Sequence, residues 1–176
     1  MQSSRRTVLA AGAGLALSPL PVVAAAADGV AAELLARSAE GQAALMQGNA
    51  RRYFEVVPLR DDFTLMSPFG GAPSHGPYTP EQVARIGDFF RNGRFTQDEV
   101  ARYETTDMVV LVVIEHAAAV EVGGLAAQDW DLRVTLVYRR DADGWRLVHR
   151  HADPLAVGLS LETSAALGRG SLPPAS

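Results

Sequence analysis

The fold of this chain is decided by the stretch Leu132-Arg-Val-Thr-Leu-Val-Tyr-Arg-Arg-Asp-Ala-Asp-Gly-Trp-Arg-Leu-Val-His-Arg-His-Ala-Asp-Pro154. Residues 132–140 are rich in β-branched and aromatic side chains, which favours a strand, and residues 145–153 favour a second. Between them, Asp141-Ala-Asp-Gly144 suits a type I turn in which Gly144 adopts the left-handed conformation and forms a bulge. The stretch therefore predicts a long β-hairpin.

The bulged turn sets the register of the hairpin. It pairs Arg139 with Leu147, Val137 with His149, Thr135 with His151 and Arg133 with Asp153. Directly opposed side chains lie on one face, so the polar members of these pairs share a face. The opposite face carries Leu132, Val134, Leu136 and Tyr138. A four-residue loop would instead shift the register by one residue and pair Val134 with His151.

The hairpin resembles the C-terminal hairpin of SnoaL-like proteins in the nuclear transport factor 2-like superfamily, and the association domain of calcium/calmodulin-dependent kinase ends similarly. The ending Trp-x-x-x-His-x-His, from Trp145 to His151, carries much of the resemblance. It implies an α+β fold, the cystatin-like cone, in which a bent antiparallel sheet wraps around N-terminal helices and encloses a pocket. The superfamily includes isomerases, dehydratases and cyclases, as well as members without known activity.

The composition bounds the kinds of partner. The chain has 176 residues, no cysteine and a net charge of −4 without a basic block. One domain with a sizeable core is expected, thiol chemistry is excluded, and nucleic acid is not a predicted partner.

The N-terminus has the pattern of an export signal. Ser3-Ser-Arg-Arg-Thr-Val-Leu9 precedes an apolar run that is broken by Pro19 and Pro21 and ends in small residues. The paired arginines resemble the twin-arginine motif, and the prolines argue against a membrane anchor. We predict a signal peptide over residues 1–27 that is cleaved near Ala26 or Ala27, leaving an exported protein that is periplasmic or secreted and has no membrane attachment. An uncleaved apolar tail is the alternative.

Further elements complete the predicted domain over residues 28–155. Helices are expected over residues 28–47 and 50–56, and a third helix begins at the capping box of Thr79 and Gln82 and ends at Asn92-Gly93. Strands are expected over residues 61–67, 95–105 and 108–122, with a Gly- and Pro-rich loop over 68–77. Residues 108–116 are apolar on both faces, which predicts a central strand covered on both sides. Residues 156–176 are predicted to form a partly disordered tail.

The candidate site is centred on Glu115, a carboxylate at the end of an apolar strand. A buried carboxylate needs a cation, and we expect Arg133 to supply it. In the resembling family a glutamate at this place looks into the cone. His151 and Asp153 share the face of Arg133 and are, with Glu115, the candidate catalytic residues. The candidate binding residues are Arg133, His149, Tyr53, Phe90 and Trp130.

A metal site is not favoured. His149, His151 and Asp153 lie on one face but are spread over about 13 Å of extended strand, too far for all three to meet one ion. No cofactor is predicted either. Three functions remain open: binding of a small apolar or weakly polar ligand, a cofactor-free isomerase, cyclase or hydratase that uses His151 with Glu115 or Asp153, and a dimeric structural domain with a vestigial pocket.

A homodimer is also predicted. The face that carries Leu132, Val134, Leu136 and Tyr138 is too apolar to remain in water, so we expect it to pack against a second subunit.

Overall fold

The computed structural model describes residues 29–170, so the predicted signal peptide lies outside the described residues. The helices are α1 (Val30–Met46), α2 (Ala50–Val56), α3 (Pro80–Phe89) and α4 (Leu161–Gly168). The strands are β1 (Leu59–Met66), β2 (Ser74–His75), β3 (Phe90–Arg91), β4 (Arg94–Glu104), β5 (Met108–Val122), β6 (Gln128–Asp141) and β7 (Gly144–Pro154).

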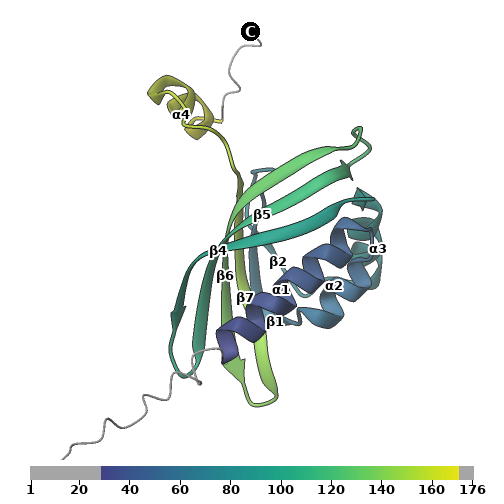
Figure 1. The fold of residues 1–176 in the computed structure, drawn as a ribbon, viewed down its shortest axis with the longest axis vertical. Helices are drawn as coiled ribbons and strands as arrows, with labels where there is room; N and C mark the ends of the chain where they lie inside the picture. Colours follow the sequence, from purple (N-terminus) through teal and green to yellow (C-terminus); the bar gives the residue numbers. More distant parts are fainter. Residues whose placement is uncertain (1–28, 171–176) are drawn as a thin grey trace, which may run out of the picture.

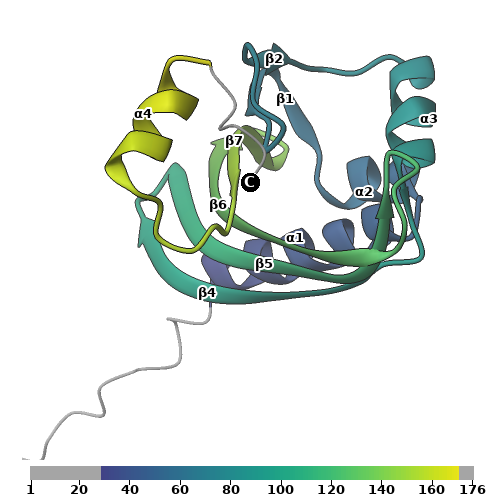
Figure 2. The ribbon, with the colours of Figure 1, turned by 90° about the horizontal axis from the view of Figure 1, so that it is seen from above.

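All seven strands form one strongly curved sheet. Its order is β2-β1-β7-β6-β5-β3, and β4 also pairs with β5. The long strands β4, β5 and β6 bend around the helices, as Figures 1 and 2 show. The pair β1 and β7 is parallel, and every other pair of described strands is antiparallel. The predicted α+β cone is confirmed.

Helices α1, α2 and α3 begin within two residues of their predicted starts. The Thr79 side chain accepts a hydrogen bond from the backbone N–H of Gln82, and the Gln82 side chain accepts one from the backbone N–H of Thr79. Asn49 caps α2 in a similar way. Helix α3 ends at Phe89 rather than at Asn92-Gly93, because Phe90 is already extended and starts β3.

One stripe of α1 packs against the inner face of the sheet. Its buried residues recur at helical spacing and are Ala31, Leu34, Ser38, Gly41, Gln42, Leu45 and Met46. The stripe meets a core from β5, β6 and β7 that includes Leu111, Leu136 and Leu147. The N-terminal helix thus supplies the surface on which the sheet closes.

The hairpin has the predicted outer register and a different turn. Arg133 pairs with Asp153, Thr135 with His151 and Val137 with His149, as expected. The loop, however, consists of Ala142 and Asp143 alone, so that Asp141 pairs with Gly144, and Tyr138 rather than Arg139 pairs with Leu147. The extra residue of the bulge is therefore Val148, within the strand, and not a residue of the turn.

The two faces of the hairpin are the reverse of those predicted. The apolar face, formed by Leu132, Val134, Leu136 and Tyr138, is buried in the core of the same chain. Since α1 and its neighbours already cover this face, the reason given for a homodimer is wrong. The homodimer itself stays a prediction.

Strand β5 is central in the sheet but is covered fully on one face only. Val109, Leu111 and Val113 are buried, whereas the alternate residues are only half-buried, so the prediction of two covered faces is wrong. A bulge between Ala117 and Val120 bends the strand, and Ala119 there has a φ of 55°. The bend carries the end of β5 around the helices.

The C-terminal segment leaves the body of the fold, as Figure 1 shows. It contains α4, so part of the predicted tail is helical, and residues 171–176 lie outside the described part. Between residues 29 and 170, no helix is long and apolar enough to cross a membrane.

Candidate functional site: a cavity inside the cone

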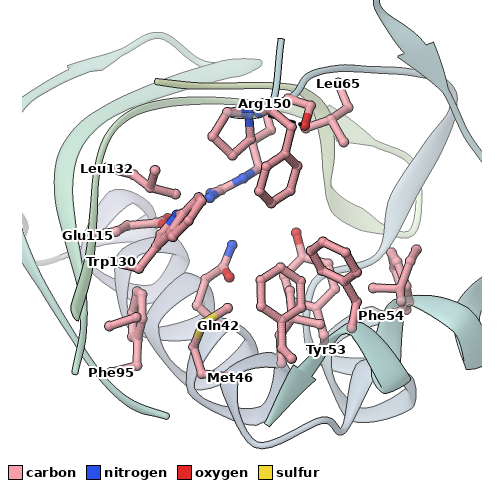
Figure 3. Close-up of a pocket in the computed structure, with 18 of the residues that line it drawn as sticks. Gln42, Met46, Tyr53, Phe54, Leu65, Phe95, Glu115, Trp130, Leu132 and Arg150 are labelled. Carbon is pink, nitrogen blue, oxygen red and sulfur yellow. Dashed lines mark hydrogen bonds and ion pairs between the residues drawn. The ribbon is translucent and has the colours of Figure 1, made fainter. Parts of the chain in front are cut away.

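A cavity of about 460 Å³ lies between the curved sheet and the helices. Its wall is mainly apolar and includes Leu45 and Met46 of α1, Phe63 and Leu65 of β1, and Leu132 of β6. Figure 3 shows the lining side chains around an open centre. The volume falls in the range of small-molecule sites in proteins. The cavity is not filled by the protein's own side chains.

Two charged groups lie in the inner wall and bind each other. Nη1 of Arg150 donates to Oε1 of Glu115 at 2.6 Å, and Nη2 donates to Oε2 at 2.7 Å. Glu115 is only 3% exposed and Arg150 only 8%. Parallel hydrogen bonds of this kind are the strongest geometry for a guanidinium and a carboxylate. The pair is therefore complete before any ligand enters.

The pKa values of Arg150 and of the neighbouring Tyr53 are both raised. Burial opposes the charged form of Arg150, but the charge of Glu115 and its two hydrogen bonds outweigh burial and raise the pKa of Arg150. Burial also raises the pKa of Tyr53 to about 12, an effect that Arg150 partly offsets. Tyr53 therefore keeps its proton at neutral pH and can donate a hydrogen bond.

Gln42 is a polar residue on the apolar stripe of α1. It is 3% exposed, and its amide points into the cavity in Figure 3. Among residues 29–170, no hydrogen-bond partner is found for this amide. Because the amide faces the cavity rather than packed side chains, its donor and its acceptor are accessible to a molecule in the cavity.

Aromatic rings form much of the remaining wall. The ring centroid of Phe54 lies 4.9 Å from that of Tyr53 and 5.5 Å from that of Tyr78. In the loop after β1, the ring of Phe69 lies 5.4 Å from both Phe89 and Trp130. Phe69 thus links the loop to α3 and to β6 beside the cavity.

The structure separates the predicted site residues into two groups. Tyr53, Phe90, Glu115 and Trp130 line the cavity. The others lie on the opposite face of the sheet, and these are Arg133, His149, His151 and Asp153. Glu115 and His151 are therefore not brought together.

The outer group is held by ordinary surface contacts. Arg133, with 62% of its side chain exposed, lies 3.5 Å from Asp153, and His151 also lies 3.5 Å from this carboxylate. His149 shares a 2.6 Å hydrogen bond with the Thr64 hydroxyl. Within the described residues no three His, Asp or Glu side chains are grouped so that they could hold a metal ion.

The predicted pair of Glu115 with Arg133 is wrong. Because side chains alternate along a strand, the buried Leu132 and Val134 force Arg133 outward. The same alternation turns Arg150 inward between the outward His149 and His151. Arg150 is the cation that the buried Glu115 requires.

Two site residues, Gln42 and Arg150, were missed by the sequence prediction, although each had a signal. Gln42 is three residues before Leu45 and eight after Leu34, on the stripe that the helix must bury. Arg150 shares a face with the apolar residues of the hairpin, which is unusual for a charged residue unless it is paired.

The comparison with known families agrees with the geometry. The model of the SnoaL-like domain matches residues 38–156, and the chain belongs to this family. Solved structures of nuclear transport factor 2-like proteins have the same fold. Among curated proteins, none matches the chain.

Three solved structures illustrate the range of proteins with this fold. A protein from Thiobacillus denitrificans, assigned to the calcium/calmodulin-dependent protein kinase type II association domains, is 26% identical with a TM-score of 0.53, over 69% of this chain and 94% of that chain. A ketosteroid isomerase-like protein from Erwinia carotovora is 12% identical with a TM-score of 0.56, over 72% of this chain and 97% of that chain. A nuclear transport factor 2-like protein of unknown function in nutrient uptake, from Rhodospirillum rubrum, is 23% identical with a TM-score of 0.53, over 70% of this chain and 98% of that chain. These likenesses show that the chain shares the fold of these proteins.

Removal of one partner of the buried ion pair is predicted to destabilise the protein strongly. Arg150→Met leaves the carboxylate of Glu115 buried and unpaired, and breaking such a pair typically costs about 3–5 kcal/mol. The double variant Arg150→Met with Glu115→Gln should recover part of this loss. Urea denaturation at pH 7 measures both effects.

Arg133→Met is the matched control, because Arg133 pairs with Asp153 at the surface. It should change the free energy of unfolding no more than an ordinary surface substitution does. If Arg133→Met and Arg150→Met lowered the free energy of unfolding equally, the assignment of Arg150 as the buried partner of Glu115 would be contradicted.

Two histidines on the outer face should titrate on opposite sides of the ordinary value of 6.5. A hydrogen bond with Asp131, supported by Asp98, raises the pKa of His116. Burial and the neighbouring His151 lower the pKa of His149. Protonated His116 stabilises the folded protein; this contribution is fully present below pH 6.5 and is lost as the pH rises through its raised pKa. His149 acts in the opposite direction: as the pH falls below 6.5, its lowered pKa in the folded protein reduces the free energy of unfolding.

Titration of the histidine ring resonances by NMR measures the two values directly. Asp131→Asn should lower the pKa of His116 and leave that of His149 unchanged. If His116 titrates below His149, the contacts on this face are not those described.

Proposed function

We propose that the protein is an exported small-molecule-binding protein that holds an apolar or weakly polar ligand inside the cone. The observation that carries this proposal is the open cavity of about 460 Å³, whose wall combines apolar side chains with a few inward polar groups. Proteins use cavities of this size and lining to bind small organic molecules. An open cavity also argues against a vestigial pocket, which the protein's own side chains would fill.

The acid–base alternative has less support. It required His151, with Glu115 or Asp153, to act inside the pocket, but His151 and Asp153 face away from the cavity. Glu115 is inside, and both of its oxygens already accept hydrogen bonds from Arg150. If Glu115 took a proton from a substrate, Arg150 would become an unpaired buried charge, which would oppose the reaction.

The test of binding uses 2-naphthol as a probe, because it is an apolar ring system with a single hydroxyl group. Calorimetry should show that it binds the protein purified under mild conditions. Ile86 is half-buried and lines the cavity, so Ile86→Trp should reduce the affinity at least tenfold by filling the space. Val100→Trp is the matched control, because Val100 is exposed on β4 and is not part of the lining.

Mass spectrometry of material extracted from the same preparation would name the natural ligand class. Binding of 2-naphthol that is unchanged by Ile86→Trp would show that the probe does not use the cavity. No binding of 2-naphthol at all would contradict the proposed function.

Export rests on the sequence of the first 27 residues. Arg5 and Arg6 form the pair expected of a twin-arginine signal. In a bacterium with this export route, the intact chain should reach the periplasm and begin near Asp28 after cleavage. Changing both arginines to lysine should retain the protein in the cytoplasm, and an unchanged distribution in cell fractions would contradict the proposed export.

A further inference from the structure

The unpaired amide of Gln42 narrows the chemistry of the ligand. We propose that the cavity selects an uncharged, planar apolar molecule carrying one amide group, a lactam included, which pairs with the side chain of Gln42. This inference rests on the proposed binding function and deepens it. Three observations support it: the Gln42 amide has no hydrogen-bond partner within residues 29–170, the charges of the inner wall neutralise each other, and the lining is rich in aromatic side chains.

Gln42 differs from three other glutamines of the described residues, each of which has a hydrogen bond within the fold. The amide nitrogen of Gln97 donates to the backbone oxygen of Leu35, although its amide oxygen is buried without a partner in the described part of the chain, and the amide nitrogen of Gln47 donates to the backbone oxygen of Gly93. The side-chain oxygen of Gln82 accepts from the backbone N–H of Thr79. Gln42 is more than nine-tenths buried, points into the cavity and has no such partner within residues 29–170. Its hydrogen bonds are therefore available to a ligand.

The amide of Gln42 has two halves that both need partners. Its oxygen accepts hydrogen bonds and its nitrogen donates them. A primary amide or a lactam has an N–H and a carbonyl oxygen on the same side and can pair with both halves at once. A ketone or an ether only accepts hydrogen bonds, so it would leave the oxygen of Gln42 without a donor in an apolar cavity.

The inner wall does not provide a counter-charge for an ion. Glu115 and Arg150 neutralise each other through two hydrogen bonds. The other charged lining residue is Arg85, which is exposed to solvent on α3. A carboxylate or an ammonium beside Gln42 would lose its hydration without gaining an opposite charge, so the cavity disfavours ionised ligands.

The aromatic wall favours a flat ring system. Phe54, Phe63, Tyr78, Phe95 and Trp130 all line the cavity. Aromatic side chains stack against planar apolar molecules or contact them edge to face. The volume of about 460 Å³ equals the liquid volume of about fifteen water molecules, enough for two or three fused rings with a small substituent.

The test compares three naphthalenes of matched shape on the intact protein by calorimetry at pH 7.5. They are 2-naphthamide, 2-naphthoate and 2-methylnaphthalene, which carry an amide, a carboxylate and a methyl group at one position. We expect 2-naphthamide to bind at least tenfold more tightly than either of the others. Equal or tighter binding of 2-naphthoate would overturn the inference.

The variant Gln42→Leu tests the residue. It should lower the affinity for 2-naphthamide at least tenfold, to the level of 2-methylnaphthalene, whose own affinity should not fall. Arg85→Met is the matched lining control and should leave the preference for the amide unchanged. A preference that survives Gln42→Leu would overturn the assignment, and the comparison of probes on the unmodified protein decides the question even if the variant fails to fold.

The result also separates this inference from the proposed function. If 2-methylnaphthalene binds and the amide has no advantage, the cavity binds apolar molecules but Gln42 does not select them. If none of the three probes binds, both the inference and the proposed function are wrong.

Discussion

The buried ion pair of Glu115 and Arg150 joins β5 to β7 across the inner face of β6, and the arrangement of the interior depends on it. A charge in such a place destabilises the fold unless it is both paired and hydrogen-bonded. Each member is therefore useful only if the other lies within reach. That condition requires the Glu115 face of β5 and the Arg150 face of β7 to lie on the same side of the sheet.

The ion pair also lies at the boundary between two parts of the interior. On β5, Val109, Leu111 and Val113 belong to the packed core, whereas Glu115 and Ala117 line the cavity. The same change occurs along β6, where Leu136 is core and Leu132 lines the cavity. The packed half supplies the burial that stabilises the domain, and this allows the other half to remain open.

The sequence predicted much of the fold because local signals were strong: the capping box of Thr79, the outer register of the hairpin and the long strands agree with the structure. It did not predict the site, because alternation along a strand identifies two faces but does not say which one is inside. The hairpin has one apolar and one polar face. Assigning the polar face to the cavity placed Arg133 inside and Arg150 outside, the opposite of the arrangement in the structure. That choice depends on α1, a contact between segments far apart in the chain, which residues 132–154 do not encode.

The same contact explains why the selective chemistry of the cavity comes from helix α1 as well as from the hairpin. Members of this fold share the sheet and the cone, and identities of 12–26% to solved relatives leave the lining free to differ. In this chain the strands contribute an ion pair, Glu115 with Arg150, whose two charges already neutralise each other. Gln42 is the inward polar side chain of α1 that remains unpaired within the described residues, so discrimination between ligands falls to hydrogen bonding and desolvation rather than to charge.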